Sequence, residues 1–161
     1  MKHWLFKSEP DAFSIDDLAD RPGATEPWDG IRNYQARNLM RDDMRLGDSA
    51  FFYHSSCAVP GIVGIVSVTR EAYPDHTARD PDSRYHDPKA TEEEPRWMMV
   101  DVTLVRRFAG VIPLTVLKAT SALEGMPLLK RGNRLSIQPV SAVHWRAVLR
   151  LADALKGDAS V

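Results

Sequence analysis

The chain has 161 residues, of which 43% are hydrophobic and 27% are charged, and its formal net charge is -1. This length suits one domain and is too short for two cores of ordinary size, and the near-zero charge argues against the broad positive field of a non-specific duplex binder. No apolar run approaches the roughly 18 residues of a membrane span, and Glu9 and Pro10 interrupt the N-terminal segment before a secretory apolar core could form.

The first expected elements are a short strand and a short helix. Residues 3–7 (HWLFK) are rich in aromatic side chains, which favours a strand. Pro10 ends this strand, because proline removes a backbone donor and biases the residue before it towards extended geometry. Ser14 is followed three residues later by Asp17, which resembles a capping box, so we expect a helix over Ile15 to Ala19.

The stretch from Trp28 to Asn38, WDGIRNYQARN, combines recognition groups with the start of a helix. An indole, a carboxylate, a glycine, a guanidinium, an amide and a phenol all fall within Trp28 to Tyr34, whereas a core segment would be apolar and periodic. This density favours a small binding site with Trp28 as one wall. The alternative is structural, with Trp28 as a core anchor and Asn33 as the N-cap of a helix from Tyr34 to about Asp43.

Two β-prone runs follow and are expected to pair as a hairpin. Ser49 to Ser55 (SAFFYHS) ends in polar groups, and Ile62 to Thr69 (IVGIVSVT) is almost continuously apolar, which indicates burial on both faces. Residues 73–94 lack periodicity but contain aromatic and charged side chains, and loops of this length are usually functional or disordered. We expect this loop to fold over the binding site, with Tyr85 or Lys89 near Trp28.

The last elements expected are a long strand, a helix, a short strand and a final helix. Trp97 to Phe108 alternates apolar and polar residues, which predicts a strand with one face more exposed to solvent than the other. Pro113 suits the first turn of a helix. Leu135 to Gln138 predicts a short strand, and Ser141 is the expected cap of the final helix.

Short helices interspersed among about five or six strands, without regular alternation, argue against a doubly wound sheet. The predicted fold class is α+β, with a strongly curved mixed sheet or small barrel. Residues 1–155 are expected to form one domain, and residues 156–161 a frayed tail.

The sequence contains no pattern for metal, cofactor or nucleophilic chemistry. Cys57 is its one cysteine, so neither a disulfide nor a cysteine cage can form within the chain, and its five histidines include no i,i+4 pair. No glycine-rich phosphate loop precedes a helix. We therefore expect no metal and no cofactor. A lone cysteine suits a reducing cytosol, and the expected location is cytoplasmic.

What remains is a set of polar and aromatic clusters at the ends of the expected strands and helices. They suit a planar, hydrogen-bonding ligand, because aromatic faces stack on it while hydroxyl, amide and carboxylate groups read its edge. A nucleobase fits this chemistry, and neighbouring cations could meet its phosphates, although a solvated surface is the alternative for each of them. The clusters are Lys7 to Glu9, Trp28 to Tyr34, Tyr53 to Ser55, Tyr85 to Lys89 and Lys130 to Ser136.

Seven segments, in order along the chain, also carry a resemblance: WLFKSEP (4–10), WDGIRNYQARN (28–38), GDSAFFYHSS (47–56), PGIVGIVSV (60–68), YPDHTARDPDSRYHDPK (73–89), WMMVDV (97–102) and LLKRGNRLSIQPV (128–140). They resemble the EVE domain family. The resemblance implies a PUA-like fold, a curved sheet or open barrel with surrounding helices, and a reader of modified bases, with modified cytosines in DNA as the leading ligands. It also implies that Trp28 is the pocket-wall tryptophan and that Lys7 and Ser8 match the pair that closes the pocket in the related YTH domains.

The expected function is therefore that of a non-catalytic, monomeric module that accepts a flipped-out or single-stranded modified base, in DNA rather than RNA. The expected base-binding residues are Lys7, Ser8, Glu9, Trp28, Asn33, Tyr53, His54, Ser55 and Tyr85, and the expected phosphate-binding residues are Arg32, Lys89, Lys130, Arg131 and Arg134. Two alternatives stay open. One is a small hydrolase or glycosylase-like enzyme that uses Glu9, Asp29 or His54 as acid or base. The other is a protein-interaction module with an exposed apolar patch.

Overall fold

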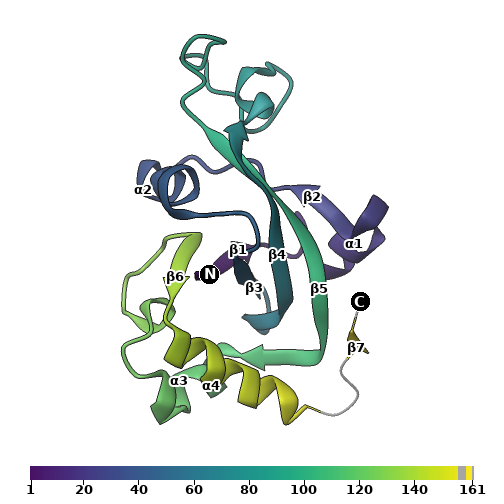
Figure 1. Cartoon of the computed structure of the whole chain (residues 1–161), viewed down its shortest axis with the longest axis vertical. Coiled ribbons are helices and arrows are strands. Elements are labelled where there is room, and N and C mark those ends of the chain that lie inside the picture. Colours follow the sequence, from purple (N-terminus) through teal and green to yellow (C-terminus); the bar gives the residue numbers. More distant parts are fainter. Residues whose placement is uncertain (156–158, 161) are drawn as a thin grey trace.

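The computed structural model describes residues 1–155 and 159–160. The strands are β1 (His3–Ser8), β2 (Thr25–Pro27), β3 (Ser49–His54), β4 (Gly61–Pro74), β5 (Met98–Pro113), β6 (Ile137–Val140) and β7 (Ala159–Ser160) (Figure 1). The α-helices are α1 (Ile15–Asp20), α2 (Tyr34–Asn38), α3 (Leu114–Ala119) and α4 (Ala142–Asp153). A π-helical turn, Leu39–Asp43, continues α2, and short 3-10 helices lie at Pro22–Ala24, His76–Arg79, Ser121–Leu123 and Pro127–Leu129.

These strands form one mixed sheet, in the order β2-β5-β4-β3-β1-β6, with β7 also paired with β5. β1 runs parallel to β3, and the other described pairs are antiparallel. The sheet is strongly curved (Figure 1), but no pairing between β6 and β2 closes it into a barrel within the described part of the chain. The strands that were predicted to share one sheet do so, which confirms the α+β class and the curved, open sheet.

The local signals for helix starts are also confirmed. The side chain of Ser14 accepts the main-chain N–H of Asp17, and the Asp17 carboxylate accepts that of Ser14, so the capping box is complete. Asn33 and Ser141 each accept a main-chain N–H from the first turn of the helix that follows, α2 and α4 respectively. Each cap satisfies a donor that has no partner inside the helix.

β4 extends further than its sequence pattern predicts. It reaches Pro74 and therefore includes Tyr73, which was expected to open the long loop. Register shifts interrupt the ladder between β4 and β5, one of them between Val68 and Arg70 and another between Arg70 and Tyr73. Because a bulge sends the following side chains to the other face of the sheet, a strict period of two is not visible in this part of the sequence.

The end of the chain is described only in part. Ala159 and Ser160 pair with Arg107 and Arg106 of β5. Residues 156–158 and 161 lie outside the described residues. The frayed tail over residues 156–161 therefore stays a prediction.

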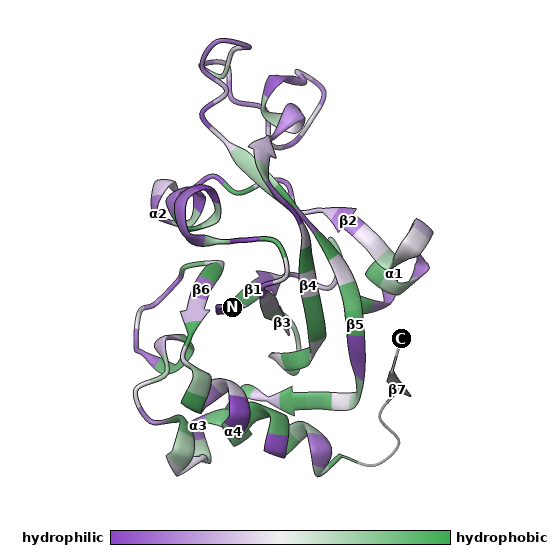
Figure 2. Cartoon of the chain, in the orientation of Figure 1, coloured by the Kyte–Doolittle hydropathy of each residue, from purple (hydrophilic) through white to green (hydrophobic). Residues whose placement is uncertain are grey.

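The curved sheet has an apolar core on each face. Successive residues of a strand point to opposite faces, so Phe6 and Phe52 join the core that contains Trp28, whereas Leu5 and Phe51 join the other. Buried side chains of α1 and α2 belong to the first core, and those of α3 and α4 to the second. In Figure 2 the hydrophobic colouring is concentrated along β4 and β5, which both cores share. The predicted burial of β4 on both faces is confirmed.

Asp48 is a buried carboxylate at the start of β3 that ties this strand to β1. It is 3% exposed and accepts hydrogen bonds from the indole Nε1 of Trp4 at 3.0 Å and from the main-chain N–H groups of Lys2 at 3.0 Å and Arg45 at 2.9 Å. Burial raises the pKa of the Asp48 carboxyl, but these donors outweigh burial and leave its pKa below the usual range. The fold therefore depends on this carboxylate in its ionised form.

We expect Asp48→Ala to lower the free energy of unfolding by about 3 kcal/mol, because the change leaves several donors without an acceptor at a buried position. Urea denaturation near neutral pH measures the change. A group whose pKa is lowered in the folded state contributes stability above its unfolded pKa and loses it as the pH falls through the folded pKa. The cost of Asp48→Ala should therefore shrink as the solution is acidified.

Asp42→Ala is the matched control, because it removes an exposed carboxylate that is paired with the neighbouring Arg41 at 2.8 Å. We expect it to leave the free energy of unfolding almost unchanged, because exposed ion pairs contribute little to stability. An Asp48→Ala protein with the same stability as this control would contradict the account of the Asp48 cluster.

Candidate functional site

A cavity of about 760 Å³ opens beside the loop that carries Trp28. Its walls come from the corner between β1 and α1, the segment from β2 towards α2, the turn after β3, the loop before β5 and the segment before β6. The lining consists of residues 7–9, 12–13, 21, 26–31, 55–56, 84–85, 133–134 and 136. A volume of a few hundred Å³ accommodates a ligand of nucleotide size.

The parallel pairing of β1 with β3 brings two polar strand ends to the same edge of the sheet. Ser8 pairs in register with His54, and the N–H of Ser55 donates to the carbonyl oxygen of Ser8 at 2.9 Å. On the other side of β1, the N–H of Lys7 donates to the carbonyl oxygen of Ser136 at 2.8 Å. The parallel strands β1 and β3 end at the same edge of the sheet, and the antiparallel β6 begins there. Lys7, Ser8, Ser55 and Ser136 therefore all reach one cavity.

Trp28 is a core anchor that also lies in the wall of the cavity, and its predicted role in binding stays a prediction. It is 7% exposed. Its ring centroid lies 5.2 Å from that of Phe6, and the edge-on contacts with Phe52 and Phe13 are 5.4 and 6.1 Å. The indole N–H of Trp4 donates to a buried carboxylate, whereas that of Trp28 has no acceptor among the described residues. The aromatic contacts fix the plane of Trp28 and leave its N–H for another partner.

Gly30 lets the loop of Trp28 pack directly against the ring of Tyr85. The φ angle of Gly30 is +79°, in the left-handed region that favours glycine, and a Cβ atom there would lie 2.7 Å from a ring carbon of Tyr85. Tyr85 lines the same cavity as Trp28, which confirms the predicted placement of Tyr85 near Trp28. Lys89, the other candidate from this loop, is exposed and does not line the cavity.

Arg32, which was predicted to bind phosphate, fastens this part of the structure together. Its guanidinium donates to the Asp75 carboxylate at 3.0 Å and to the carbonyl oxygen of Tyr85 at 2.7 and 2.9 Å. It also donates to the carbonyl oxygen of Ile31 at 2.9 Å and to the hydroxyl of Thr77 at 3.3 Å. Its donors are thus used within the protein, and they hold Tyr85 against the loop of Trp28.

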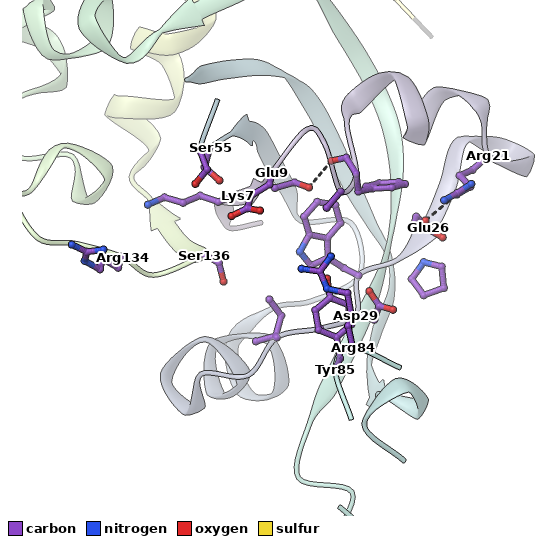
Figure 3. A pocket seen from close by; sticks show the side chains of 18 of the residues that line it. Lys7, Glu9, Arg21, Glu26, Asp29, Ser55, Arg84, Tyr85, Arg134 and Ser136 are labelled. Atoms are coloured by element: carbon purple, nitrogen blue, oxygen red, sulfur yellow. Dashed lines mark hydrogen bonds and ion pairs between the residues drawn. The ribbon is translucent and has the colours of Figure 1, made fainter. Parts of the chain in front are cut away.

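The cavity lining carries charges of both signs. Burial lowers the pKa of Lys7, on the wall formed by β1. On the opposite wall, burial and the neighbouring carboxylates of Asp75 and Glu26 raise the pKa of Asp29. Figure 3 shows these two walls, with one group consisting of Lys7, Ser55, Arg134 and Ser136 and the other of Asp29, Arg84 and Tyr85. This arrangement suits a ligand that combines a planar, polar edge with a nearby phosphate.

Several predicted residues lie outside the lining. Asn33 is exposed and caps α2, and Tyr53 is 3% exposed within the second core. His54 accepts the N–H of Ile15 through Nε2 at 3.1 Å, at the start of α1, and burial lowers the pKa of its imidazole. None of these three side chains lines the cavity. The others are exposed cations beyond the lining: Lys89, Lys130 and Arg131.

Sequence reasoning left Phe13 and Arg84 out of the site. It counted the carboxylate of Asp29 among the recognition groups beside Trp28 but did not name Asp29 as a base-binding residue, yet all three line the cavity. The neighbouring positions Trp28 and Tyr85 were the available signals for Asp29 and Arg84. Phe13 follows the proline that ends β1, and nothing in its local sequence indicates that the chain turns back towards Trp28.

Metal and membrane features were searched among the described residues. No three His, Cys, Asp or Glu side chains there are placed to hold a metal ion. None of the helices in residues 1–155 is both long and apolar enough to cross a membrane. Cys57 is a free, half-buried thiol.

The chain is similar to proteins and structures already known. The EVE domain family model matches residues 2–151. Human thymocyte nuclear protein 1 is 46% identical over 94% of this chain and 74% of its own length. The structure of human THYN1 protein in complex with 5-methylcytosine-containing DNA has a TM-score of 0.89 at 44% identity, covering 95% of this chain and 98% of that chain. A crystal structure of a Pseudomonas syringae protein has a TM-score of 0.88 at 54% identity, covering 93% and 99%.

The names of the relatives correct one expectation and the extent of the similarity settles the family. Relatives from human, mouse and chicken, 45–46% identical to this chain, are named thymocyte nuclear protein 1, which points to the nucleus, so the expected cytoplasmic location is wrong. A lone cysteine could not distinguish the two, because disulfides are rare in both compartments. The match over residues 2–151 and these identities show that the chain belongs to the EVE domain family.

Proposed function

We propose that the chain is a non-catalytic DNA-binding module that holds a modified cytosine, such as 5-methylcytosine, in the cavity at Trp28. The observation that supports this most strongly is the complex of human THYN1 protein with 5-methylcytosine-containing DNA, whose protein has the same fold at a TM-score of 0.89 and 44% identity. The cavity of about 760 Å³ in this chain is large enough for an extruded nucleotide.

In this proposal Trp28 supplies the stacking face and the β1 end supplies groups for the edge of the base. The hydroxyl of Ser8 donates its one proton to the carbonyl oxygen of Phe13. Its lone pairs are therefore what it offers to a ligand, and they suit the exocyclic amino group of cytosine. Lys7 adds donors on the same wall, and Glu9 and Ser55 complete the polar rim beside it.

The energetics require phosphate contacts beside the base. Extruding a base from a duplex costs a few kcal/mol, and stacking on an aromatic side chain returns about 1 to 3 kcal/mol. Arg134 lines the cavity and is exposed, so we assign it to a DNA phosphate. We propose that the chain binds as a monomer, through a single domain of residues 1–155.

Two observations favour a reader over the alternatives. The imidazole of His54, a candidate general base, accepts the N–H of Ile15 at 3.1 Å and is therefore already engaged in the fold. The largest exposed apolar side chains lie singly on different elements, among them Tyr34 on α2, Val105 on β5 and Val143 on α4, which does not favour a protein-docking patch.

We expect Trp28→Phe to weaken binding to an oligonucleotide with one 5-methylcytosine by about 1 kcal/mol, roughly fivefold, because a smaller ring without an N–H replaces the indole. Fluorescence anisotropy measures binding of single-stranded and duplex DNA, each with and without the methyl group, and of matching RNA. Phenylalanine is chosen because alanine at this site would also cost about 3 to 5 kcal/mol of folding.

Trp4→Phe is the matched control, since Trp4 belongs to the same core as Trp28 but does not line the cavity. It should lower the melting temperature by losing its bond to Asp48 and leave the affinity for methylated DNA unchanged. An equal loss of affinity in both variants would show that the binding site is not at Trp28. Conversion of the methylated oligonucleotide into a product would instead support the enzyme alternative.

We also expect Arg134→Ala to weaken binding equally for methylated and unmethylated DNA. Loss of one phosphate contact lowers the slope of log K against log salt concentration by about 0.9 for duplex and about 0.7 for single strands. A salt titration of parent and variant measures this slope. Arg150→Ala, at an exposed position of α4 outside the cavity, should leave the slope unchanged, and a variant at Arg134 with the slope of the parent would exclude the phosphate contact.

A further inference from the structure

Asp29 is an acidic side chain of the cavity that the fold leaves without a partner. Glu26, on the same wall, is ion-paired with Arg21 at 2.9 Å, and Glu9 is exposed to solvent. The carboxyl of Asp29 is half-buried, and apart from its own main chain no described residue donates a hydrogen bond to it or pairs with it. Buried polar groups are normally satisfied, so this carboxyl is positioned for a group that comes from outside.

A tight turn directs the side chains of Trp28 and Asp29 into the same cavity. Successive side chains of an extended strand point to opposite faces, but here the N–H of Asp29 donates to the carbonyl oxygen of Pro27 at 3.1 Å and closes a three-residue turn around Trp28. The N–H of Gly30 then donates to the Asp75 carboxylate at 2.9 Å and holds the turn in place. A planar base against Trp28 therefore has Asp29 at its edge.

The groups that face Asp29 favour its neutral form. Burial is the largest cause that raises its pKa, the carboxylates of Asp75 and Glu26 act in the same direction, and the imidazole of His76 opposes them. The cations nearby are engaged elsewhere. Arg32 is ion-paired with Asp75 at 3.0 Å, and Arg21 is ion-paired with Glu26. Arg84 lies over the ring of Tyr85 at 5.0 Å. Lys7 lies on the wall formed by β1, together with the carboxylate-bearing Glu9.

We propose that Asp29 binds the Watson–Crick edge of the cytosine and shares one proton with its ring nitrogen N3, an inference that rests on the proposed function. This edge presents the N3 acceptor beside the N4 amino donor. A neutral carboxyl matches both, because its O–H donates to N3 and its carbonyl oxygen accepts from the amino group. A carboxylate has acceptors only and would face the lone pair of N3. The solvent supplies the shared proton, so binding takes up one proton wherever Asp29 is ionised in the free protein.

The test is the pH dependence of binding to a single-stranded oligonucleotide with one central 5-methylcytosine, measured by fluorescence anisotropy from about pH 5 to about pH 8. The Kd of the parent should rise by up to about tenfold per pH unit above the pKa of Asp29. Asp29→Asn carries an N–H donor and a carbonyl acceptor at every pH, so its Kd should stay flat and lie below that of the parent at alkaline pH. Asp29→Ala should bind more weakly than Asp29→Asn throughout.

Two further measurements separate this reading from a structural role. Calorimetry in buffers of different ionisation heat should show uptake of about one proton for the parent and none for Asp29→Asn. His76→Gln removes the imidazole whose charge reaches Asp29 and should keep the pH dependence. Since an ionised Asp29 is held against burial and two like charges, Asp29→Asn should melt no lower than the parent at neutral pH, which a thermal scan checks.

Parallel pH profiles for the parent and Asp29→Asn, or an Asp29→Ala protein that binds like the parent at about pH 5, would overturn the inference. Its failure is distinguishable from failure of the proposed function. A parent that binds the methylated oligonucleotide no better than the unmethylated one at any pH defeats the proposed function and this inference with it. A preference for 5-methylcytosine that is the same in all Asp29 variants defeats only the assignment of Asp29.

Discussion

The carboxylate of Asp75 holds the cavity together. It is fully buried and accepts hydrogen bonds from the N–H of Gly30 at 2.9 Å, from the guanidinium of Arg32 at 3.0 Å, and from both the N–H and the hydroxyl of Thr77 at 2.9 and 2.6 Å. Burial raises the pKa of this carboxyl, but the donors outweigh burial and lower it. One ionised side chain thereby joins the loop of Trp28 to a segment 45 positions further along the chain. Removing either Asp75 or Arg32 would leave the charge of the other without compensation, which is among the most destabilising changes a protein can undergo.

This network means that the walls of the cavity are in place before a ligand arrives. Arg32 extends the network from Asp75 to the main chain of Tyr85, and the ring of Tyr85 packs against Gly30. Aromatic contacts fix Trp28 from the other side. A site whose side chains are already ordered loses less conformational entropy on binding, so modest stacking and hydrogen-bond energies suffice for useful affinity. The donors of Arg32 are used in this network, and the proposed function assigns contact with the DNA backbone to Arg134 at the rim of the cavity.

Patterns that depend on near neighbours in the sequence could be predicted, and contacts between distant segments could not. The helix cap at Ser14 and the strands β1, β3, β4 and β5 follow from local spacing and composition, whereas β2 was not predicted. The loop of Trp28 could be located because its indole, carboxylate and glycine are consecutive. Arg32 looked like a phosphate ligand because its partner Asp75 is 43 positions away, and a guanidinium beside aromatic residues does not reveal that its donors are taken. Ser136 reaches the cavity only because β6 pairs with β1, a relation that no local pattern encodes.

The placement of the two cores on opposite faces of the sheet bears on how such proteins can diverge. Leu5 and Phe51 belong to the core covered by α3 and α4, and none of the buried residues of that core lines the cavity. Phe6 and Phe52 lie on the other face and contact Trp28. Substitutions in the second core, which α3 and α4 cover, can therefore change thermal stability without changing the lining of the cavity. A new ligand preference has to arise in the loops and strand ends around Trp28, which line the cavity.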